Sequence, residues 1–173
     1  MKWGELVLLP LKRVDVRTEL RGSTANTTVE LIYINQSSDS PLECSYSFPL
    51  EKNTLLADFE CKIEEKVIKT KVMEKERARE RYEDAMAAGD TAVLAERDAK
   101  EEIVSVKLGQ LQPGEQATIK SHIVSQVEIV GGHYAFSLPT SFFPDYRKFG
   151  MRCESYPYEF NYEARIVSDG RIT

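Results

Sequence analysis

Apolar and polar residues alternate with a period of two along most of this chain. The stretch from Leu11 to Leu20 reads LKRVDVRTEL, in which Val, Val, Thr and Leu stand at every second position between charged residues. Because successive side chains of a β-strand point to opposite faces, this spacing predicts a strand with one buried and one polar face. Alternation or β-branched composition predicts further strands over 27–34, 42–48, 55–63, 67–73, 92–96, 103–111, 117–130, 134–138 and 156–166.

Turn residues separate the predicted strands. Gly22 to Asn26 is expected to close a hairpin, Pro113-Gly114 marks a turn, and Gly131-Gly132 fits a two-residue hairpin connection. Parallel neighbours need a crossover of a dozen or more residues, usually a helix, and only one stretch has helical spacing. The predicted fold class is therefore mainly β, an antiparallel β-sandwich or open barrel with one amphipathic helix.

The alternation also predicts which side chains share a core face. The residues expected on one common face are Val104, Val106, Leu108, Ile119, Ile123 and Val127. The strand over 55–63 is expected to direct Ala57, Phe59, Cys61 and Ile63 to one side.

The single helix is predicted over about 74–88. Its apolar residues Ala78, Tyr82, Ala85 and Met86 recur at the spacing of one helical stripe, and Gly89 is suited to end it. The positions around its start are mostly charged, with both signs mixed. Such a face is either a solvated outer surface or a binding surface, and the pattern favours the solvated one.

Charge and hydropathy exclude several classes of function. The 173 residues carry a formal net charge of -5, so phosphate backbones repel the chain, and we expect no nucleic-acid partner. The apolar run from Leu6 to Leu11 contains Pro10 and is far shorter than the about 20 residues of a membrane span, so no membrane insertion is expected. The same start lacks the features of a signal peptide. This predicts a cytoplasmic protein if Met1 is the native start, and an extracellular one only if the chain is a processed fragment.

The residues that carry chemistry do not form a recognisable catalytic or metal site. His122 and His133 are the only histidines, and neither has a second histidine or cysteine at ligand spacing. Cys44, Cys61 and Cys153 are widely spaced, which favours reduced, packed thiols. The sequence also lacks the serine nucleophile elbow, the phosphate-binding loop and the dinucleotide fingerprint. We therefore predict that the chain is not an enzyme and uses no metal or cofactor.

One aromatic cluster lies in a proline-bounded stretch after the strand predicted over 134–138. Phe142, Phe143, Pro144 and Tyr146 do not alternate with polar residues. If exposed, they form an apolar patch of the kind that contacts another protein, and they are the candidate partner-contact patch. The alternative is that the rings fold back as a plug over one end of the sandwich, which the usual burial of aromatic residues favours.

Five short motifs in a fixed order point to a known family. They are YSFPL at 46–50, RYEDA at 81–85, AVLAE at 92–96, VSVKLGQLQPGE at 104–115 and YAFSLPT at 134–140. In order and spacing they resemble the VIT domain (vault protein inter-alpha-trypsin), with similarity from about Leu6 to Tyr146. The chain looks most like the intracellular proteins that combine a VIT domain with a von Willebrand factor A domain.

The resemblance implies a non-enzymatic, β-rich module that usually precedes a von Willebrand factor A domain. It supplies no catalytic residues, and the metal site of such proteins belongs to the A domain, whose D-x-S-x-S motif does not occur here. Residues 1–146 are expected to form the VIT-like domain. Residues 147–173 are expected to be a linker and the first strand of a following, truncated β segment, whose edge needs a neighbouring strand, which we expect in the rest of the same protein.

The predicted function is protein–protein interaction or scaffolding within a larger protein or assembly. The expected partner is a protein, either a von Willebrand factor A domain in the same protein or other subunits of an assembly. The alternative is a small-ligand or carbohydrate-binding β-sandwich that uses Phe142, Phe143 and Tyr146.

Overall fold

The computed structural model describes residues 9–49, 53–70, 73–74, 94–98, 103–144, 157–168 and 170. Its strands are β1 (Leu11–Arg21), β2 (Thr24–Ile34), β3 (Leu42–Pro49), β4 (Thr54–Ile63), β5 (Lys66–Thr70), β6 (Met73–Glu74), β7 (Leu94–Asp98), β8 (Ile103–Leu111), β9 (Gln116–Gln126), β10 (Glu128–Val130), β11 (His133–Ala135) and β12 (Glu159–Val167). One short 3-10 helix, η1 (Thr140–Phe142), lies between β11 and β12. The mainly β prediction is confirmed. The helix predicted over 74–88 lies outside the described residues, except that Glu74 ends β6.

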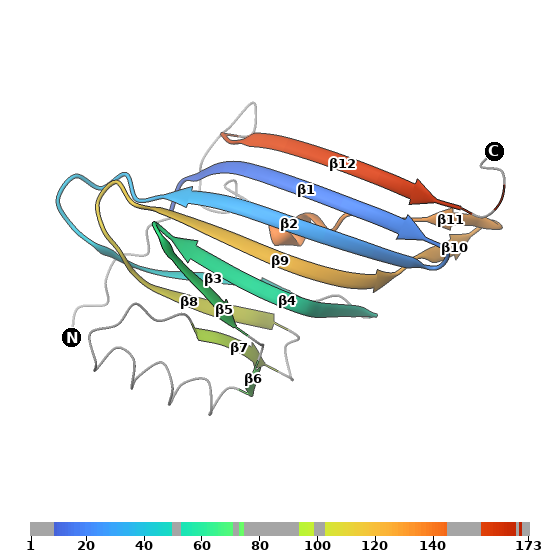
Figure 1. Ribbon diagram of the computed structural model, residues 1–173, viewed down its shortest axis with the longest axis horizontal. Coiled ribbons are helices and arrows are strands. Elements are labelled where there is room, and N and C mark those ends of the chain that lie inside the picture. Colours follow the sequence, from blue (N-terminus) through green and yellow to red (C-terminus); the bar gives the residue numbers. More distant parts are fainter. Residues whose placement is uncertain are drawn as a thin grey trace.

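The described strands form open sheets that pack as a sandwich (Figure 1). One sheet has six strands in the order β12-β1-β2-β9-β4-β5, and a second has four in the order β3-β8-β7-β6. The strands β10 and β11 form a separate two-stranded hairpin. Most pairs are antiparallel, as predicted, but β1 pairs with β12 and β6 with β7 in parallel.

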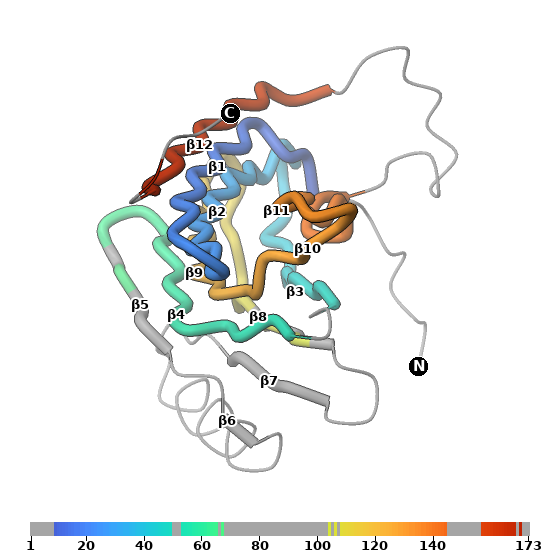
Figure 2. Tube along the Cα trace, turned by 90° about the vertical axis from the view of Figure 1, so that its right-hand side faces the viewer, coloured from blue at the N-terminus to red at the C-terminus, as the bar shows by residue number. Residues whose placement is uncertain are grey.

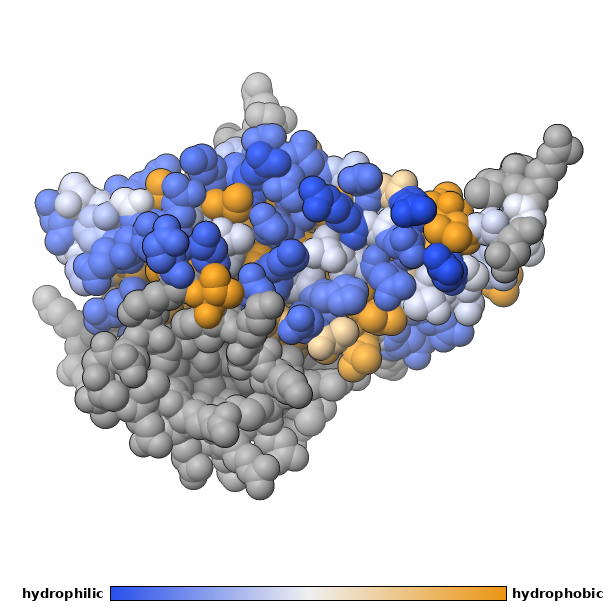
Figure 3. Space-filling model, in the orientation of Figure 1, coloured by the Kyte–Doolittle hydropathy of each residue, from blue (hydrophilic) through white to orange (hydrophobic). Residues whose placement is uncertain are grey.

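Both large sheets contribute side chains to one hydrophobic core. Val14, Val16 and Leu31 come from the six-stranded sheet, and Phe48 and Val106 come from the four-stranded sheet. All of these are at most 1% exposed. The predicted core face is confirmed, since its six members are all buried: Val104, Val106, Leu108, Ile119, Ile123 and Val127. The opposite face of the six-stranded sheet is mostly hydrophilic (Figure 3).

A β-bulge in β4 changes which of its side chains reach the core. Leu56 pairs with Ile123 and Asp58 pairs with His122, so Ala57 is an extra residue without a direct partner. The bulge shifts the alternation by one position, and Leu56 is buried while Ala57 is exposed. The prediction that Ala57 faces the core was therefore wrong, and the predictions for Phe59, Cys61 and Ile63 are confirmed.

Asn35 closes one end of the sandwich, where β2 ends. It is 0% exposed, and its side-chain amide donates to the carbonyl oxygens of Leu111, at 2.8 Å, and Ser40, at 3.3 Å. Its Oδ1 accepts from the Ser37 backbone N–H at 2.9 Å. The Asn35 backbone also bonds to the turn between β8 and β9, at Gly114 N and Glu115 O. One side chain therefore ties two loops together with its polar groups satisfied.

The strand predicted over 156–166 is present as β12, and it pairs with β1 from Arg13↔Glu159 to Arg21↔Val167. This strand was expected to need a neighbouring strand in the rest of the same protein, and β1 of this chain is one such neighbour. The domain boundary at residue 146 stays a prediction.

Candidate interaction surface

The chain leaves the six-stranded sheet at Val127. The sequence predicted one strand over 117–130, but β9 ends at Gln126 and β10 begins at Glu128. The backbone N–H of Val127 donates to the Ser23 carbonyl oxygen at 2.8 Å, and its side chain is 5% exposed. This contact with the turn between β1 and β2 redirects the chain out of the sheet.

The redirected chain forms the β10–β11 hairpin, whose side chains are all exposed. Gly131 and Gly132 make the turn with φ of 60° and 82°, values that glycine adopts without steric cost. Figure 2 shows the hairpin at one end of the sandwich. Ile129, Val130 and Tyr134 are 68%, 60% and 65% exposed. This hairpin end therefore presents apolar side chains to solvent.

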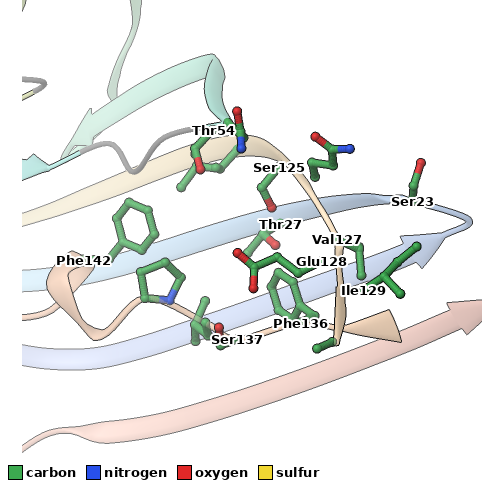
Figure 4. Close-up of a pocket in the computed structure, with 16 residues that line it drawn as sticks. Ser23, Thr27, Thr54, Ser125, Val127, Glu128, Ile129, Phe136, Ser137 and Phe142 are labelled. Carbon is green, nitrogen blue, oxygen red and sulfur yellow. The ribbon is translucent and has the colours of Figure 1, made fainter. Parts of the chain in front are cut away.

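A pocket of about 600 Å³ lies beside the hairpin (Figure 4). It is lined by Ser23, Thr27, Asn53, Thr54, Ile123, Ser125, Gln126, Val127, Glu128, Ile129, Ala135, Phe136, Ser137, Leu138, Pro139 and Phe142. Hydroxyl and amide groups line part of it, aliphatic and aromatic groups line the rest, and Glu128 is the one charged residue among these described side chains. Its size falls in the range of small-molecule pockets.

Of the candidate patch predicted from the sequence, the structure describes Phe142, Phe143 and Pro144. Phe142 is 4% exposed and its ring centroid lies 5.5 Å from that of Phe48. Its carbonyl oxygen accepts a 2.9 Å hydrogen bond from the Tyr46 hydroxyl, and burial raises the pKa of that hydroxyl well above its ordinary value. Phe143 and Pro144 are partly buried.

Phe143 also contacts β12, since its ring lies edge-on to Phe160 with centroids 5.7 Å apart. Tyr146 lies outside the described residues. Partner contact by Phe142, Phe143, Pro144 and Tyr146 stays a prediction.

The histidines and cysteines do not come together in the described part of the chain. His133 is exposed and its Nδ1 lies 3.1 Å from the Gly131 carbonyl oxygen, whereas His122 is partly buried on β9. Cys44 and Cys61 are buried free thiols, and burial raises the pKa of Cys61 to about 12. Cys153 lies outside the described residues. Among those described, no three His, Cys, Asp or Glu side chains are grouped closely enough to hold a metal ion.

Sequence reasoning did not single out the hairpin residues. A signal was present, because Ile129 and Val130 are consecutive apolar residues that break the alternation just before Gly131-Gly132. A break in the alternation means that the pattern of a strand with one buried face does not continue past this point. No helix in the described residues is long and apolar enough to cross a membrane.

Comparison with known proteins identifies the family. The sequence model of the Vault protein inter-alpha-trypsin (VIT) domain matches residues 11–123, which cover β1 to most of β9. The chain belongs to the VIT domain family. The resemblance drawn from the five motifs is confirmed.

Relatives of this VIT domain are much longer proteins. It is 30% identical over 149 residues to von Willebrand factor A domain-containing protein 5A of Homo sapiens, which covers 85% of this chain and 19% of the relative. It is 29% identical over 153 residues to a von Willebrand factor A domain-containing protein of Dictyostelium discoideum, and this match covers 88% of this chain and 15% of the relative. It is 31% identical over 137 residues to protein mono-ADP-ribosyltransferase PARP4 of Homo sapiens, and this match covers 79% of this chain and 8% of the relative. The chain spans less than a fifth of each of these relatives.

Proposed function

We propose that this VIT domain is a non-enzymatic protein-interaction module that binds another protein domain through the β10–β11 hairpin. The observation that carries the proposal is the exposure of Ile129 and Tyr134, at 68% and 65%, which lie opposite each other on one face of the hairpin. Adjacent exposed apolar side chains of this size are typical of protein contacts, and aromatic residues such as tyrosine are enriched at binding hot spots. The proposal includes a scaffolding role in a cytoplasmic protein or assembly.

The partner we propose is a von Willebrand factor A domain, in the same protein or in another subunit. Support comes from the names of the relatives, which are von Willebrand factor A domain-containing proteins in human and Dictyostelium discoideum.

The test measures binding of the 173-residue chain to the von Willebrand factor A domain of the human 5A relative by titration calorimetry. We expect saturable binding that Ile129→Ser and Tyr134→Ser each weaken by about tenfold, the loss typical of a hot-spot residue. The matched control is Val67→Ser, which removes an apolar side chain of similar exposure, 49%, from β5. Absence of binding, or equal losses in the control and the hairpin variants, would contradict the proposal.

The pocket favours a second candidate function, the binding of a small ligand or carbohydrate. Carbohydrates combine hydroxyl groups with apolar ring faces, and the lining offers hydroxyl and amide groups beside Phe136 and Phe142. A thermal-shift screen tests this, because a ligand at 100 times its Kd adds about 2.7 kcal/mol to the free energy of unfolding. Ser137→Trp, which fills the pocket, should abolish any shift, and Ser38→Trp on a distant exposed loop should not. A screen without shifts would exclude this function.

A further inference from the structure

β12 ends the six-stranded sheet, and its outer edge has no neighbouring strand among the described residues. The strand runs for nine residues, EFNYEARIV, without proline or glycine. Its β1 partner fixes its register along the whole length. An edge of this length presents a row of unpaired backbone N–H and C=O groups that can pair with a further strand.

The two faces of β12 differ in character. Phe160, Tyr162 and Ile166 are partnered with Val14, Val16 and Leu20 of β1, so they lie on the core-facing side of the sheet. They nevertheless remain 46%, 46% and 57% exposed. The sheet therefore extends its apolar face past the part that the core covers.

The outer face of β12 carries charged and amide side chains that match those of β1. The pairs across the two strands are Arg13–Glu159 at 4.0 Å, Asn161–Asp15 at 2.9 Å, Arg17–Glu163 at 3.7 Å and Arg165–Glu19 at 3.9 Å. Asp15 also accepts hydrogen bonds from Arg13 of its own strand, and these lower the pKa of its carboxyl group. β12 is thus held by β1 on one side, and no described strand pairs with its other side.

The charged residues on the outer face of β12 are complementary to those of β12 in a second copy of the chain. If two β12 strands pair antiparallel about Tyr162, Glu159 lies opposite Arg165 of the second copy and Asn161 lies opposite Glu163. Directly opposed side chains lie about 4.5–5.5 Å apart, close enough for ion pairs and hydrogen bonds.

Neighbouring registers are less favourable. Pairing about Glu163 or about Arg165 sets that residue opposite itself, and pairing about Asn161 sets Glu159 opposite Glu163. Directly opposed like charges destabilise a strand pair. Pairing about Ala164 leaves Asn161 opposite Val167 and uses only the Glu163–Arg165 pair.

We infer that two copies of this chain associate through antiparallel pairing of their β12 strands, about a twofold axis at Tyr162. The pairing joins the two six-stranded sheets into one continuous sheet. It also sets the exposed apolar side chains of both copies side by side on one face, with the two tyrosines at the axis. The charge pairs fix the register, and the apolar area and backbone hydrogen bonds supply most of the affinity.

Charge reversal tests this self-association. Arg165→Glu places a carboxylate opposite Glu159 of the second copy, and Glu159→Arg places two guanidinium groups opposite each other. Sedimentation velocity over a concentration series should show each variant associating about tenfold more weakly than the natural chain. An equimolar mixture of the two variants restores both ion pairs and should associate as strongly as the natural chain. The control Lys62→Glu makes the same change in charge on β4, which β1, β2 and β9 separate from β12, and should have no effect.

Cysteine cross-linking tests the register. In a Cys153→Ser background, Tyr162→Cys brings two Cα atoms to about 4.5–5.5 Å, a separation that a disulfide spans, and should give a covalent dimer on oxidation. Ala164→Cys is the matched control, because its two copies would lie roughly 13 Å apart along the paired strands. A natural chain that stays monomeric, a mixture that associates no better than the single variants, or cross-linking at 164 instead of 162 would overturn the inference. Ile129→Ser leaves this edge intact, so loss of hairpin binding and loss of self-association are separate results.

Discussion

The two ends of β2 lie in regions that differ in which side chains are buried and which are exposed. Where β2 ends, Asn35 is 0% exposed and its amide, carbonyl and backbone groups are hydrogen bonded to two loops. Where β2 begins, the neighbouring β10–β11 hairpin leaves Ile129 and Tyr134 more than 60% exposed. Polar groups are buried at one end and apolar groups are exposed at the other. The buried, hydrogen-bonded Asn35 stabilises the fold. The exposed apolar side chains of the hairpin contribute little to stability, and we expect them to contact a partner.

The largest loss of stability is expected when the closed end is opened. Asn35→Ala leaves the Leu111 carbonyl oxygen and the Ser37 N–H without their partner. Buried groups that lose a hydrogen bond cost about 1–3 kcal/mol each, so we expect the free energy of unfolding to fall by about 3 kcal/mol. Urea denaturation measures this. Gln36→Ala, at the exposed neighbouring position, should change it by less than about 0.5 kcal/mol.

The dependence of stability on alkaline pH tests whether the core between the two ends of β2 excludes solvent. Burial raises the pKa of Cys61 from 9.0 to about 12, so the folded chain keeps this thiol protonated where the unfolded chain ionises. The unfolded state then binds fewer protons, and stability falls as the pH rises from about 9 towards about 12, by up to about 1.4 kcal/mol per pH unit. Cys61→Ala should lose this part of the slope in denaturation curves measured at pH 8 to 10.5. An unchanged slope would show that solvent reaches this thiol.

A smaller effect is expected from the hydrogen bond that ties η1 to β3. Tyr46→Phe removes the hydroxyl that donates to the Phe142 carbonyl oxygen at 2.9 Å, while the ring still packs against Phe48. We expect a loss of about 1 kcal/mol, the usual net value of one hydrogen bond. Thermal unfolding monitored by calorimetry measures it. Tyr134→Phe, on the exposed hairpin, is the matched control, and equal losses in both variants would contradict this assignment.

The sequence predicted the body of the sandwich well because its signals are local. Alternation along β1, β2 and β8 follows directly from the two faces of a strand, and the family motif at 104–115 begins on β8. The bulge at Ala57 could not be predicted in this way, because it depends on how β4 pairs with β9.

The hairpin end was harder to predict because tertiary contacts decide it. The bond from Val127 to Ser23 breaks one predicted strand into two. Phe142 has the same local pattern whether it is exposed or buried, and its contact with Phe48 is made across the fold. The parallel pairing of β12 with β1 joins segments that are about 146 positions apart, which no periodicity reveals.

The smallest effect on stability is expected at the hairpin itself, and it decides whether the two ends truly differ. Ile129→Ser and Tyr134→Ser remove side chains that are 68% and 65% exposed, so folding buries little of their apolar surface. We expect each to change the free energy of unfolding by less than about 0.5 kcal/mol in urea denaturation, the range of ordinary surface substitutions. A loss of 2 kcal/mol or more would mean that these residues belong to the core, and the contrast with Asn35 would fail. Stability that stays unchanged while partner binding is lost would instead separate the two ends by role, because the same substitutions would then act on the complex and not on the fold.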